Sequence, residues 1–510
     1  RSRGLGDVYK RQASADKDAG AAFLKYKDFK PYVDYFNSME DENIAQAIPN
    51  ARASQWMEEN IPLFECSQKN FEEMYYYRWW TLRKHIKETP VGYGMTEFLV
   101  NRSYADKYNL IACAIGHHIY ESRWLRNPEY LNQIIHTWYR GNEGGPMAKM
   151  TKFSSWNADA VLGRYMVDGN KEFLLDMVKD LEAEYARWEK TNRLPNGLYW
   201  QGDVQDGMEE SISGGRRKQY ARPTINSYMY GNAKALSLIG IMTGDEGMAM
   251  KYGLKADSIK TLVQDKLWNT DHHFFETMRG DASAEVREAI GYIPWYFNLP
   301  DASSKYTVAW KEVMDEKGFS APYGLTTAER RHPEFRTHGV GKCEWDGAIW
   351  PFASAQTLTA MANFMNNYPQ TVLTDSVYFH QMERYVESQH HRGRPYIGEY
   401  LDEVTGYWLK GDQERSRYYN HSTFNDLMIT GLIGLRPRMD NTVEVNPLIP
   451  EGKWDYFCLD NVLYHGRNLT ILWDKDGSRY QRGKGLHIYV DGKEVGHADT
   501  LTRVLCENVL

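Results

Sequence analysis

The spacing of apolar and polar positions predicts a long run of paired helices. Between about residues 70 and 434, apolar side chains recur at helical spacing in twelve successive segments. No Pro-rich or Ser-rich linker interrupts residues 60–435, so we expect one large unit over 70–434 that contains six helical hairpins. The predicted helices are 70–88, 109–124, 127–140, 155–168, 170–190, 223–243, 246–267, 289–297, 303–316, 347–367, 372–390 and 421–434.

Several of these segments place aromatic rings and histidines on the face that the periodicity would bury. YYYRWW at 75–80 and GHHIYESRW at 116–124 are examples. A helix that is apolar around most of its circumference is covered on both sides, so we expect an inner ring of helices wrapped by an outer ring. One side of this ring would carry the long connections and a concave site built from them. These connections are 191–222, 270–300, 318–350 and 391–420.

The period changes after Leu435, and short alternating segments predict a small antiparallel β domain at 435–504 followed by a tail at 505–510. The expected strands lie at 442–445, 456–462, 469–473 and 485–490, separated by the turn pairs Asp476-Gly477 and Asp491-Gly492. Residues 13–69 are expected to pack on the helical ring. Residues 1–12 end in DVYKRQ, which a common sequencing adaptor encodes, so we interpret them as read-through and leave them out of the fold.

Composition excludes several classes of protein. The net charge of −7 argues against a nucleic-acid binder, and no apolar run approaches the roughly 20 residues of a membrane span. Five scattered cysteines indicate neither a zinc site nor a disulfide framework. No cofactor is predicted. If the true N-terminus is missing, an export signal was lost with it, and we expect a periplasmic or secreted bacterial protein.

The aromatic content of 14% suits recognition of sugars, because Tyr and Trp combine a flat apolar face with a polar group. Candidate chemistry lies in an acidic loop, where Asp203, Asp206, Glu209 and Glu210 fall within eight residues directly before a predicted helix at 223–243. Like charges this close raise one another's pKa, as a general acid requires. A solvated acidic loop and a structural Ca²⁺ site are the alternatives.

Three motifs resemble those of the six-hairpin (α/α) toroid glycosidases, the clan that contains trehalase, processing α-glucosidase I and mannosylglycerate hydrolase. DGMEES at 206–211 resembles the clan's SGxDxS segment, WDGAIWP at 345–351 its WxGPxW strip, and GEYLDEVTG at 398–406 its ENYNPxTG segment. The first motif departs by Glu for Asp and by Asp206 for Ser, and Ala348 replaces the usual Pro of the second. The resemblance covers roughly residues 70–500.

The resemblance implies a fold, an activity and residue roles. The fold is mainly α, an (α/α)6 toroid followed by a small antiparallel β domain. The activity is that of an inverting glycoside hydrolase, with Glu209 as general acid, Asp206 as its rival, and Glu399 as general base. An oligosaccharide or glycoside is the expected substrate, and the long loops favour exo action on a chain end. Predicted sugar contacts are Trp345, Asp346, Trp350, Arg222, Asn226, His117, His118, Trp156, Tyr400 and His421.

Each candidate also has a structural interpretation. Glu399 could cap its own loop, and the aromatic rings could serve packing alone. His117 and His118 could bind a metal, but they lack a carboxylate at ligand spacing. His421 with Ser422 could suggest a nucleophile, but no third group or GxSxG elbow accompanies them.

The sequence also allows two other functions. A polysaccharide lyase or sugar epimerase on the same toroid could use Tyr120 and Arg123 together with His117 and His118. Such an enzyme needs a basic cleft, whereas the candidates here are mainly acidic and aromatic. A carbohydrate-binding protein without catalysis would leave Glu209 and Glu399 far apart or hold one of them in a salt bridge.

Overall fold

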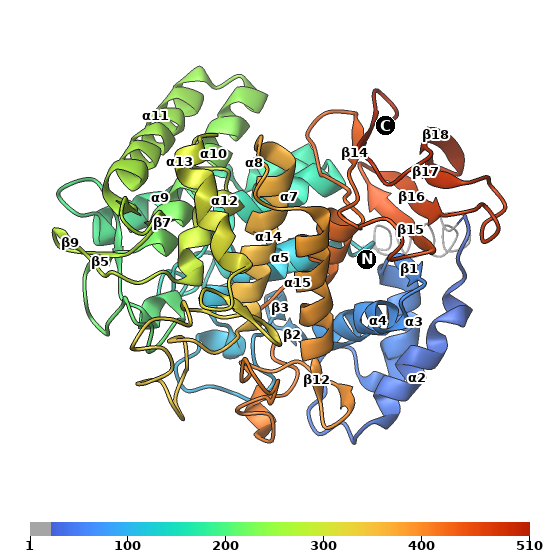
Figure 1. Cartoon of the computed structure of the whole chain (residues 1–510), viewed down its shortest axis with the longest axis horizontal. Coiled ribbons are helices and arrows are strands. Elements are labelled where there is room, and N and C mark those ends of the chain that lie inside the picture. The colour runs from blue at the N-terminus through green and yellow to red at the C-terminus, as the bar shows by residue number, and fades with distance from the viewer. Residues whose placement is uncertain (1–21) are drawn as a thin grey trace.

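The computed structural model describes residues 22–510. The predicted read-through at 1–12 and the start of the 13–69 segment lie outside these residues. Helices and strands are placed as Figure 1 shows, with the helical ring filling the centre and left and the β domain at the upper right. No helix among the described residues has the length and apolar character needed to cross a bilayer.

Six helices form a closed inner ring in which each contacts the next, in the order α5, α7, α10, α12, α14, α16 and back to α5. These helices are mostly buried; α10, for example, is covered along nearly its whole length up to Gly240. Their bounds are α5 Ile115–Ser122, α7 Asn157–Asp168, α10 Pro223–Thr243, α12 Ile293–Tyr296, α14 Pro351–Asn367 and α16 Asn425–Leu427, which continues as a π-helical turn to Leu432.

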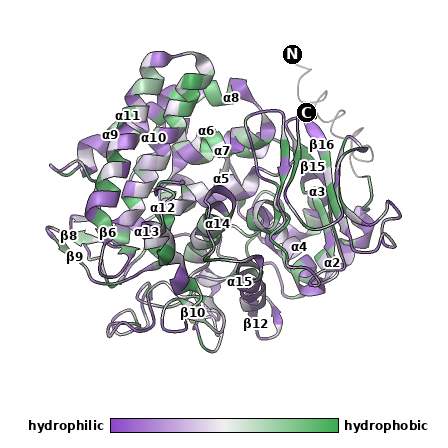
Figure 2. Cartoon of the chain, turned by 45° about the horizontal axis from the view of Figure 1, so that its top comes forward, coloured by the Kyte–Doolittle hydropathy of each residue, from purple (hydrophilic) through white to green (hydrophobic). Residues whose placement is uncertain are grey.

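An outer helix precedes each inner one, which confirms the predicted six hairpins and the (α/α)6 toroid. The outer elements alternate polar and apolar residues along their length (Figure 2), as expected of helices with one wet face. They are α4 Lys69–Lys84, α6 Glu129–Arg140, α9 Val178–Asn192 with the short α8 Lys171–Asp176 before it, α11 Glu246–Leu262, α13 Ser304–Thr307 with a 3₁₀ turn to Val313, and α15 Asp375–Ser388.

Local sequence explains where these helices begin and end. Pro223 and Pro351 stand in the first turns of α10 and α14, where a missing N–H costs nothing. Gly244 ends α10 with a φ of 73°, and Asp245 then caps α11 by accepting a hydrogen bond from the Met248 N–H at 3.0 Å. The α10–α11 hairpin therefore follows from the two consecutive turn residues Gly244 and Asp245.

The C-terminal β domain is confirmed, and its sheets also include strands from outside the expected strand segments. Its main sheet has the order β1-β15-β16-β17-β18, and the strand β1 Leu63–Cys66 comes from the N-terminal segment and pairs with β15. The predicted tail also contains a strand, β19, which pairs with β14. The remaining bounds are β14 Val443–Val445, β15 Tyr456–Tyr464, β16 Arg467–Asp474, β17 Gly485–Val490, β18 Lys493–Ala498 and β19 Val504–Cys506.

The N-terminal segment ties the two parts of the molecule together. Helices α2 Lys30–Ser38 and α3 Asn50–Asn60 pack on α4, as predicted for residues that cover the ring. Buried Asp460 on β15 accepts backbone N–H groups from Ala22, Phe23 and Leu24 at 2.7–3.1 Å. The N-terminal segment therefore contributes to the sheet of the β domain and also covers the outer helix α4.

The long connections interlock on one side of the toroid. Short strands β4 Trp200–Gln201, β5 Tyr220–Ala221, β8 Met278–Arg279 and β9 Ala282–Ser283 join two of them in one sheet. Single bridges connect Glu288 with Ala328 and Ile349 with Leu401. Small hairpins complete the loops: β2 Ile86–Thr89 with β3 Gly92–Met95, β6 Trp268–Asn269 with β7 Phe274–Phe275, β10 Ser320–Ala321 with β11 Gly324–Leu325, and β12 His390–His391 with β13 Arg394–Pro395.

Candidate active site

The three motifs lie on connections that lead into the N-terminal ends of inner helices. The acidic loop precedes α10, the strip at 345–351 leads into α14, and the segment at 398–406 precedes α16. Because these helices form one ring, their N-terminal ends open on the same mouth. Backbone N–H groups and helix dipoles point into this mouth, which favours negatively charged side chains there.

Glu209 is half-buried, and within residues 22–510 no other side chain hydrogen-bonds its carboxyl group. Burial raises its pKa to about 7, and the charges of Asp203 and Glu399 act in the same direction, while Lys410 acts against them. A carboxyl group with this pKa carries its proton part of the time at neutral pH, as a general acid must.

Glu399 is held by a hairpin. Leu401 bridges Trp408, and the Leu409 N–H donates to the Tyr400 carbonyl at 3.1 Å. The Glu399 side chain is 5% exposed; it accepts a hydrogen bond from the Ser416 hydroxyl at 3.0 Å and lies 3.6 Å from the Lys410 ammonium group. The structure therefore brings Glu399 into the electrostatic range of Glu209, although 190 residues separate them.

A third carboxylate, Glu97, lies in the same place and was missed by sequence reasoning. It accepts hydrogen bonds from the Cys113 thiol at 3.0 Å and the Tyr419 hydroxyl at 2.8 Å. Burial raises the pKa of Glu97 to about 7, and the charges of Glu399 and Glu209 add to the effect. The position of Glu97 in the sequence could have identified it, because Glu97 stands in the connection before α5. The recognised motifs stand in the same position relative to their own inner helices.

Aromatic rings form a continuous stack beside these carboxylates. Trp345 and Trp350 are stacked with ring centroids 4.7 Å apart, and Trp350 and Tyr400 stack at 4.6 Å. The indole N–H groups of Trp345 and Trp350 have no hydrogen-bond partner in the described part of the chain. Buried donors without partners are costly, so these two indoles are available for sugar hydroxyl groups. His421 packs against Trp350 and Tyr419.

Asp346 has one oxygen engaged and one free. Its Oδ2 accepts the N–H groups of His338 at 3.1 Å and Gly339 at 2.9 Å, whereas Oδ1 is buried without a partner among residues 22–510. This arrangement fixes the carboxylate and leaves one buried acceptor free, so Asp346 remains a candidate contact for a ligand hydroxyl.

Asp206 does not fit the role of rival acid that the sequence left open for it. Its Oδ2 accepts hydrogen bonds from Arg222 Nε at 2.7 Å and the Thr224 hydroxyl at 2.6 Å, and Oδ1 accepts from the Ser154 hydroxyl. The side chains of Asp206 and Arg222 are both 0% exposed. Both oxygens are occupied as acceptors, so the pair anchors the acidic loop to the start of α10.

We expect Asp206→Asn to lower the free energy of unfolding by about 3–5 kcal/mol, since it leaves the Arg222 guanidinium buried without its counter-charge. Urea unfolding followed by tryptophan fluorescence measures this loss. Asp34→Asn is the matched control: the Lys30–Asp34 pair has side chains 53% and 57% exposed, and its loss should cost under about 1 kcal/mol. Equal losses in both variants would contradict the anchoring role.

The structure contradicts two of the predicted sugar contacts, Asn226 and Trp156. The Asn226 amide uses its oxygen for the Tyr199 N–H and its NH₂ group for the carbonyls of Tyr199 and Arg222, all at 2.8 Å, so it pins the loop instead of facing a ligand. Trp156 is fully buried and donates to the Tyr296 hydroxyl at 3.0 Å. Its indole fits against Gly116, where a Cβ would lie 2.1 Å from the ring, so Trp156 belongs to the core.

The two adjacent histidines are buried inside the ring. Nε2 of His117 lies 3.2 Å from the Phe352 carbonyl, and Nε2 of His118 lies 2.7 Å from the Asn420 carbonyl. Burial lowers their pKa values to about 3 and about 4, so both are neutral at pH 7. Uncharged histidines tied to these carbonyls join α5 to α14 and to the segment before α16.

The four residues proposed for the lyase alternative do not lie together: Tyr120 and Arg123 line one cavity, whereas His117 and His118 are buried inside the ring. The Tyr120 hydroxyl donates to Asp159 at 2.6 Å, and Arg123 pairs with Asp426 at 2.8 Å. Both line a cavity of about 690 Å³ to which all six inner helices contribute, together with the linker around Arg436. None of the three carboxylates lines it. A base–cation set for a lyase is therefore not assembled at the motif-bearing mouth.

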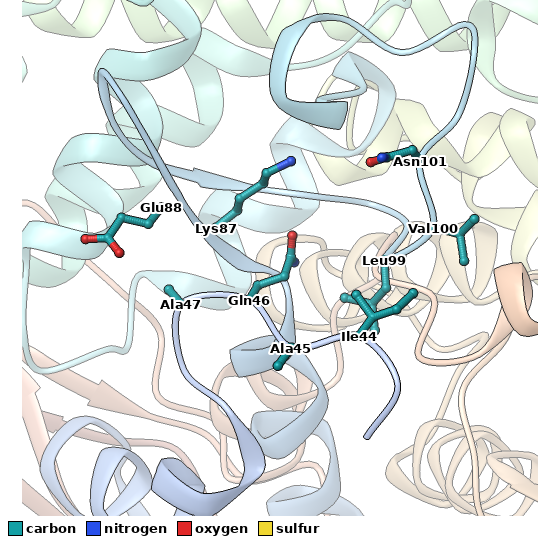
Figure 3. A pocket seen from close by; sticks show the side chains of 9 residues that line it. All are labelled: Ile44, Ala45, Gln46, Ala47, Lys87, Glu88, Leu99, Val100 and Asn101. Carbon is teal, nitrogen blue, oxygen red and sulfur yellow. The ribbon is translucent and has the colours of Figure 1, made fainter. Parts of the chain in front are cut away.

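Other cavities also lie apart from the carboxylates. One of about 630 Å³ is lined by side chains from three segments, as Figure 3 shows: residues 44–47, Lys87 with Glu88, and residues 99–101. It adjoins the connection that carries Glu97 but does not include it. The described side chains able to share a metal ion are His272, Glu276 and Glu285. The predicted Ca²⁺ alternative concerned the cluster at 203–210, which is a different loop.

A toroid with carboxyl groups on the loops at one mouth is the arrangement expected of a glycoside hydrolase, and comparison with known proteins supports this class. A model of the mannosylglycerate hydrolase MGH1-like glycoside hydrolase domain matches residues 107–422. The chain belongs to this family. A model of the C-terminal domain of glycosyl hydrolase family 65 matches residues 435–497.

Solved structures agree with this assignment. A protein named sialidase is 84% identical over 97% of this chain, with a TM-score of 0.96, and this chain spans 46% of that protein. The GH63 mannosylglycerate hydrolase of Thermus thermophilus, in complex with glucose, is 12% identical over 70% of this chain and 99% of its own, with a TM-score of 0.52. A GH78 rhamnosidase of Bacillus sp. GL1 is 11% identical over 84% of this chain and 41% of its own, with a TM-score of 0.56. The last two show the fold alone.

Proposed function

We propose that this chain hydrolyses the terminal glycosidic bond of a neutral sugar, with inversion, using Glu209 as general acid and Glu399 as general base. The observation that supports the proposal is that two separate motifs stand before inner helices of one ring, where the charge of Glu399 acts on the pKa of Glu209. Protonation by Glu209 lets the leaving oxygen depart, and Glu399 deprotonates the water that attacks from the other face of the ring.

The other groups of the mouth are assigned to sugar binding. Glu97 can accept hydrogen bonds from ring hydroxyls, and the indoles of Trp345 and Trp350 can donate to them. The free oxygen of Asp346 adds a further acceptor. The long connections that surround these side chains favour exo action, because loops that close over a site admit the end of a glycan more readily than its middle.

A second candidate is release of a sialic acid, favoured by the name of the 84% identical structure. That name belongs to a chain about twice as long, of which this one spans 46%. Three carboxylates around the site disfavour an anionic sugar, because recognition of a carboxylate calls for arginine. A panel of neutral p-nitrophenyl glycosides beside 4-methylumbelliferyl N-acetylneuraminate separates the two candidates. Activity confined to the neuraminate would overturn our proposal.

The surroundings of Glu209 predict how the activity depends on pH. Glu209 must be protonated to act, and burial raises its pKa to about 7, so activity should fall as pH rises through about 7. The acidic limb should follow protonation of the base, giving a bell-shaped profile of kcat/KM. Initial rates from pH 4 to 9 on the best substrate of the panel measure it. An activity that climbs steadily to pH 9 would exclude Glu209 as the acid.

A further inference from the structure

The hairpin that carries the proposed base also carries a cation opposite it. Leu401 and Trp408 are paired across this hairpin, so the antiparallel register places Tyr400 opposite Leu409 and Glu399 opposite Lys410. Directly opposed residues on an antiparallel pair have side chains in contact range. The Lys410 Nζ lies 3.6 Å from Glu399 Oε2 accordingly.

The hairpin itself is rigid. Asp402 begins its turn, where Oδ1 accepts the N–H groups of Val404 at 2.9 Å and Thr405 at 2.8 Å. Arg336, from the neighbouring connection, binds Asp402 at 2.6 Å and Glu403 at 2.8 Å. The turn is therefore fixed both by hydrogen bonds within it and by Arg336 from another connection. These contacts fix the pairing of Glu399 with Lys410.

Lys410 is buried where its charge acts strongly. Its side chain is 9% exposed, and its ammonium group lies 5.2 Å from the centre of the Tyr400 ring and 4.0 Å from the Cys343 sulfur. A buried charge is screened less than an exposed one. Other titratable groups on which Glu399 acts are Glu97, Glu209, Cys343, Tyr396, Tyr400, Tyr419 and His421.

Among these groups, Lys410 is the cation in direct contact with Glu399. Glu97 and Glu209 are themselves acidic, and the buried His421 has a pKa lowered well below its usual range, so it adds no charge. Arg415 acts on Cys343 and Tyr400, and it hydrogen-bonds to Gln413 at 3.0 Å. Without Lys410, three carboxyl groups would share one mouth with no close counter-charge.

We propose that Lys410 is the positioning residue that supplies the counter-charge of Glu399 and orients it as a base, through its cross-strand contact in the 399–410 hairpin. The inference rests on the proposed function for the role of Glu399, and its geometry is independent of the sugar cleaved. Lys410 also acts on Glu209, whose pKa it lowers against the effect of burial. Removing the lysine should therefore move both limbs of the pH profile in the same direction.

The test compares Lys410→Met with the wild type. An opposite charge at this range shifts a carboxyl group by about 1–3 pH units, so both limbs of kcat/KM should move up by about 1 unit. Lys410→Arg should keep the wild-type profile. Lys342→Met is the matched control, because this lysine is 66% exposed and pairs with Glu210 at 3.6 Å, not with Glu399. A Lys410→Met profile that coincides with that of the control would overturn the inference.

A second measurement does not depend on activity. Carbon-13 NMR of glutamate-labelled protein, with the Glu399 signal identified by its loss in Glu399→Gln, gives the titration midpoint of this carboxyl group directly. We expect the midpoint to rise by about 1 unit in Lys410→Met, and an unchanged midpoint would refute the inference. If the wild type hydrolyses no glycoside of the panel but the midpoint shifts, the proposed function fails while the role of Lys410 stands.

Discussion

Glu209→Gln should lower kcat/KM about 10²–10⁴-fold on glycosides with an alkoxide leaving group, and far less on aryl glycosides. The amide cannot donate a proton to the leaving oxygen. A nitrophenolate needs little protonation to depart, so its release depends less on the acid. Rates on a disaccharide and on the matching p-nitrophenyl glycoside measure the difference.

The neighbouring carboxylate provides the control for this prediction. Glu210 lies 3.7 Å from His338 and 3.6 Å from Lys342, on the outer side of the same loop. Glu210→Gln should retain more than about a tenth of the wild-type rate on both substrates, because a partly exposed pair contributes about 1 kcal/mol or less. If Glu210→Gln and Glu209→Gln lost activity equally and without regard to the leaving group, Glu209 would not be the acid.

Glu399→Ala should lower kcat about 10²–10⁴-fold whatever the leaving group, because the attacking water then lacks its base. The deleted side chain leaves space for a small anion. Sodium azide should restore part of the rate by attacking the sugar directly, and the product should be a glycosyl azide of inverted configuration. Mass spectrometry and proton NMR of the product test this.

Asp412→Asn serves as the control for Glu399→Ala, since Asp412 follows the same hairpin, has a side chain that is 54% exposed, and pairs with Arg392 at 2.9 Å. We expect it to keep most of the activity and to show no rescue by azide. An azide product of retained configuration from Glu399→Ala would contradict the assignment of Glu399 as a general base.

The helical framework could be predicted from sequence because periodicity reports burial directly. All twelve predicted helices in the ring are present, and the strongest signals, such as 223–243, match the observed bounds of α10. The prediction of the β domain omitted strands at its edges. Nothing local in residues 63–66 reveals that their partner lies near residue 460, because strand pairing is settled by contacts between distant segments.

The site was predictable as far as motifs reached. Glu209 and Glu399 could be found from their segments, but the place of Asp206 could not, because a carboxylate in a motif looks the same whether it faces a cavity or an arginine. Glu97 belongs to no recognised motif, and its importance appears only when the connection before α5 is seen beside the other two carboxylates. Asn226 and Trp156 were predicted as sugar contacts by residue type and position, yet both side chains are buried and bonded to other parts of the protein.

The stereochemistry of the reaction tests the opposed acid and base most directly. Proton NMR of the first sugar released from the best substrate, recorded before mutarotation, identifies the anomer formed. We predict the anomer opposite to that of the substrate, as required when Glu399 activates a water held between two carboxyl groups about 6.5–9.5 Å apart. Release of the same anomer as the substrate would mean a covalent intermediate and would contradict the roles given to Glu209 and Glu399.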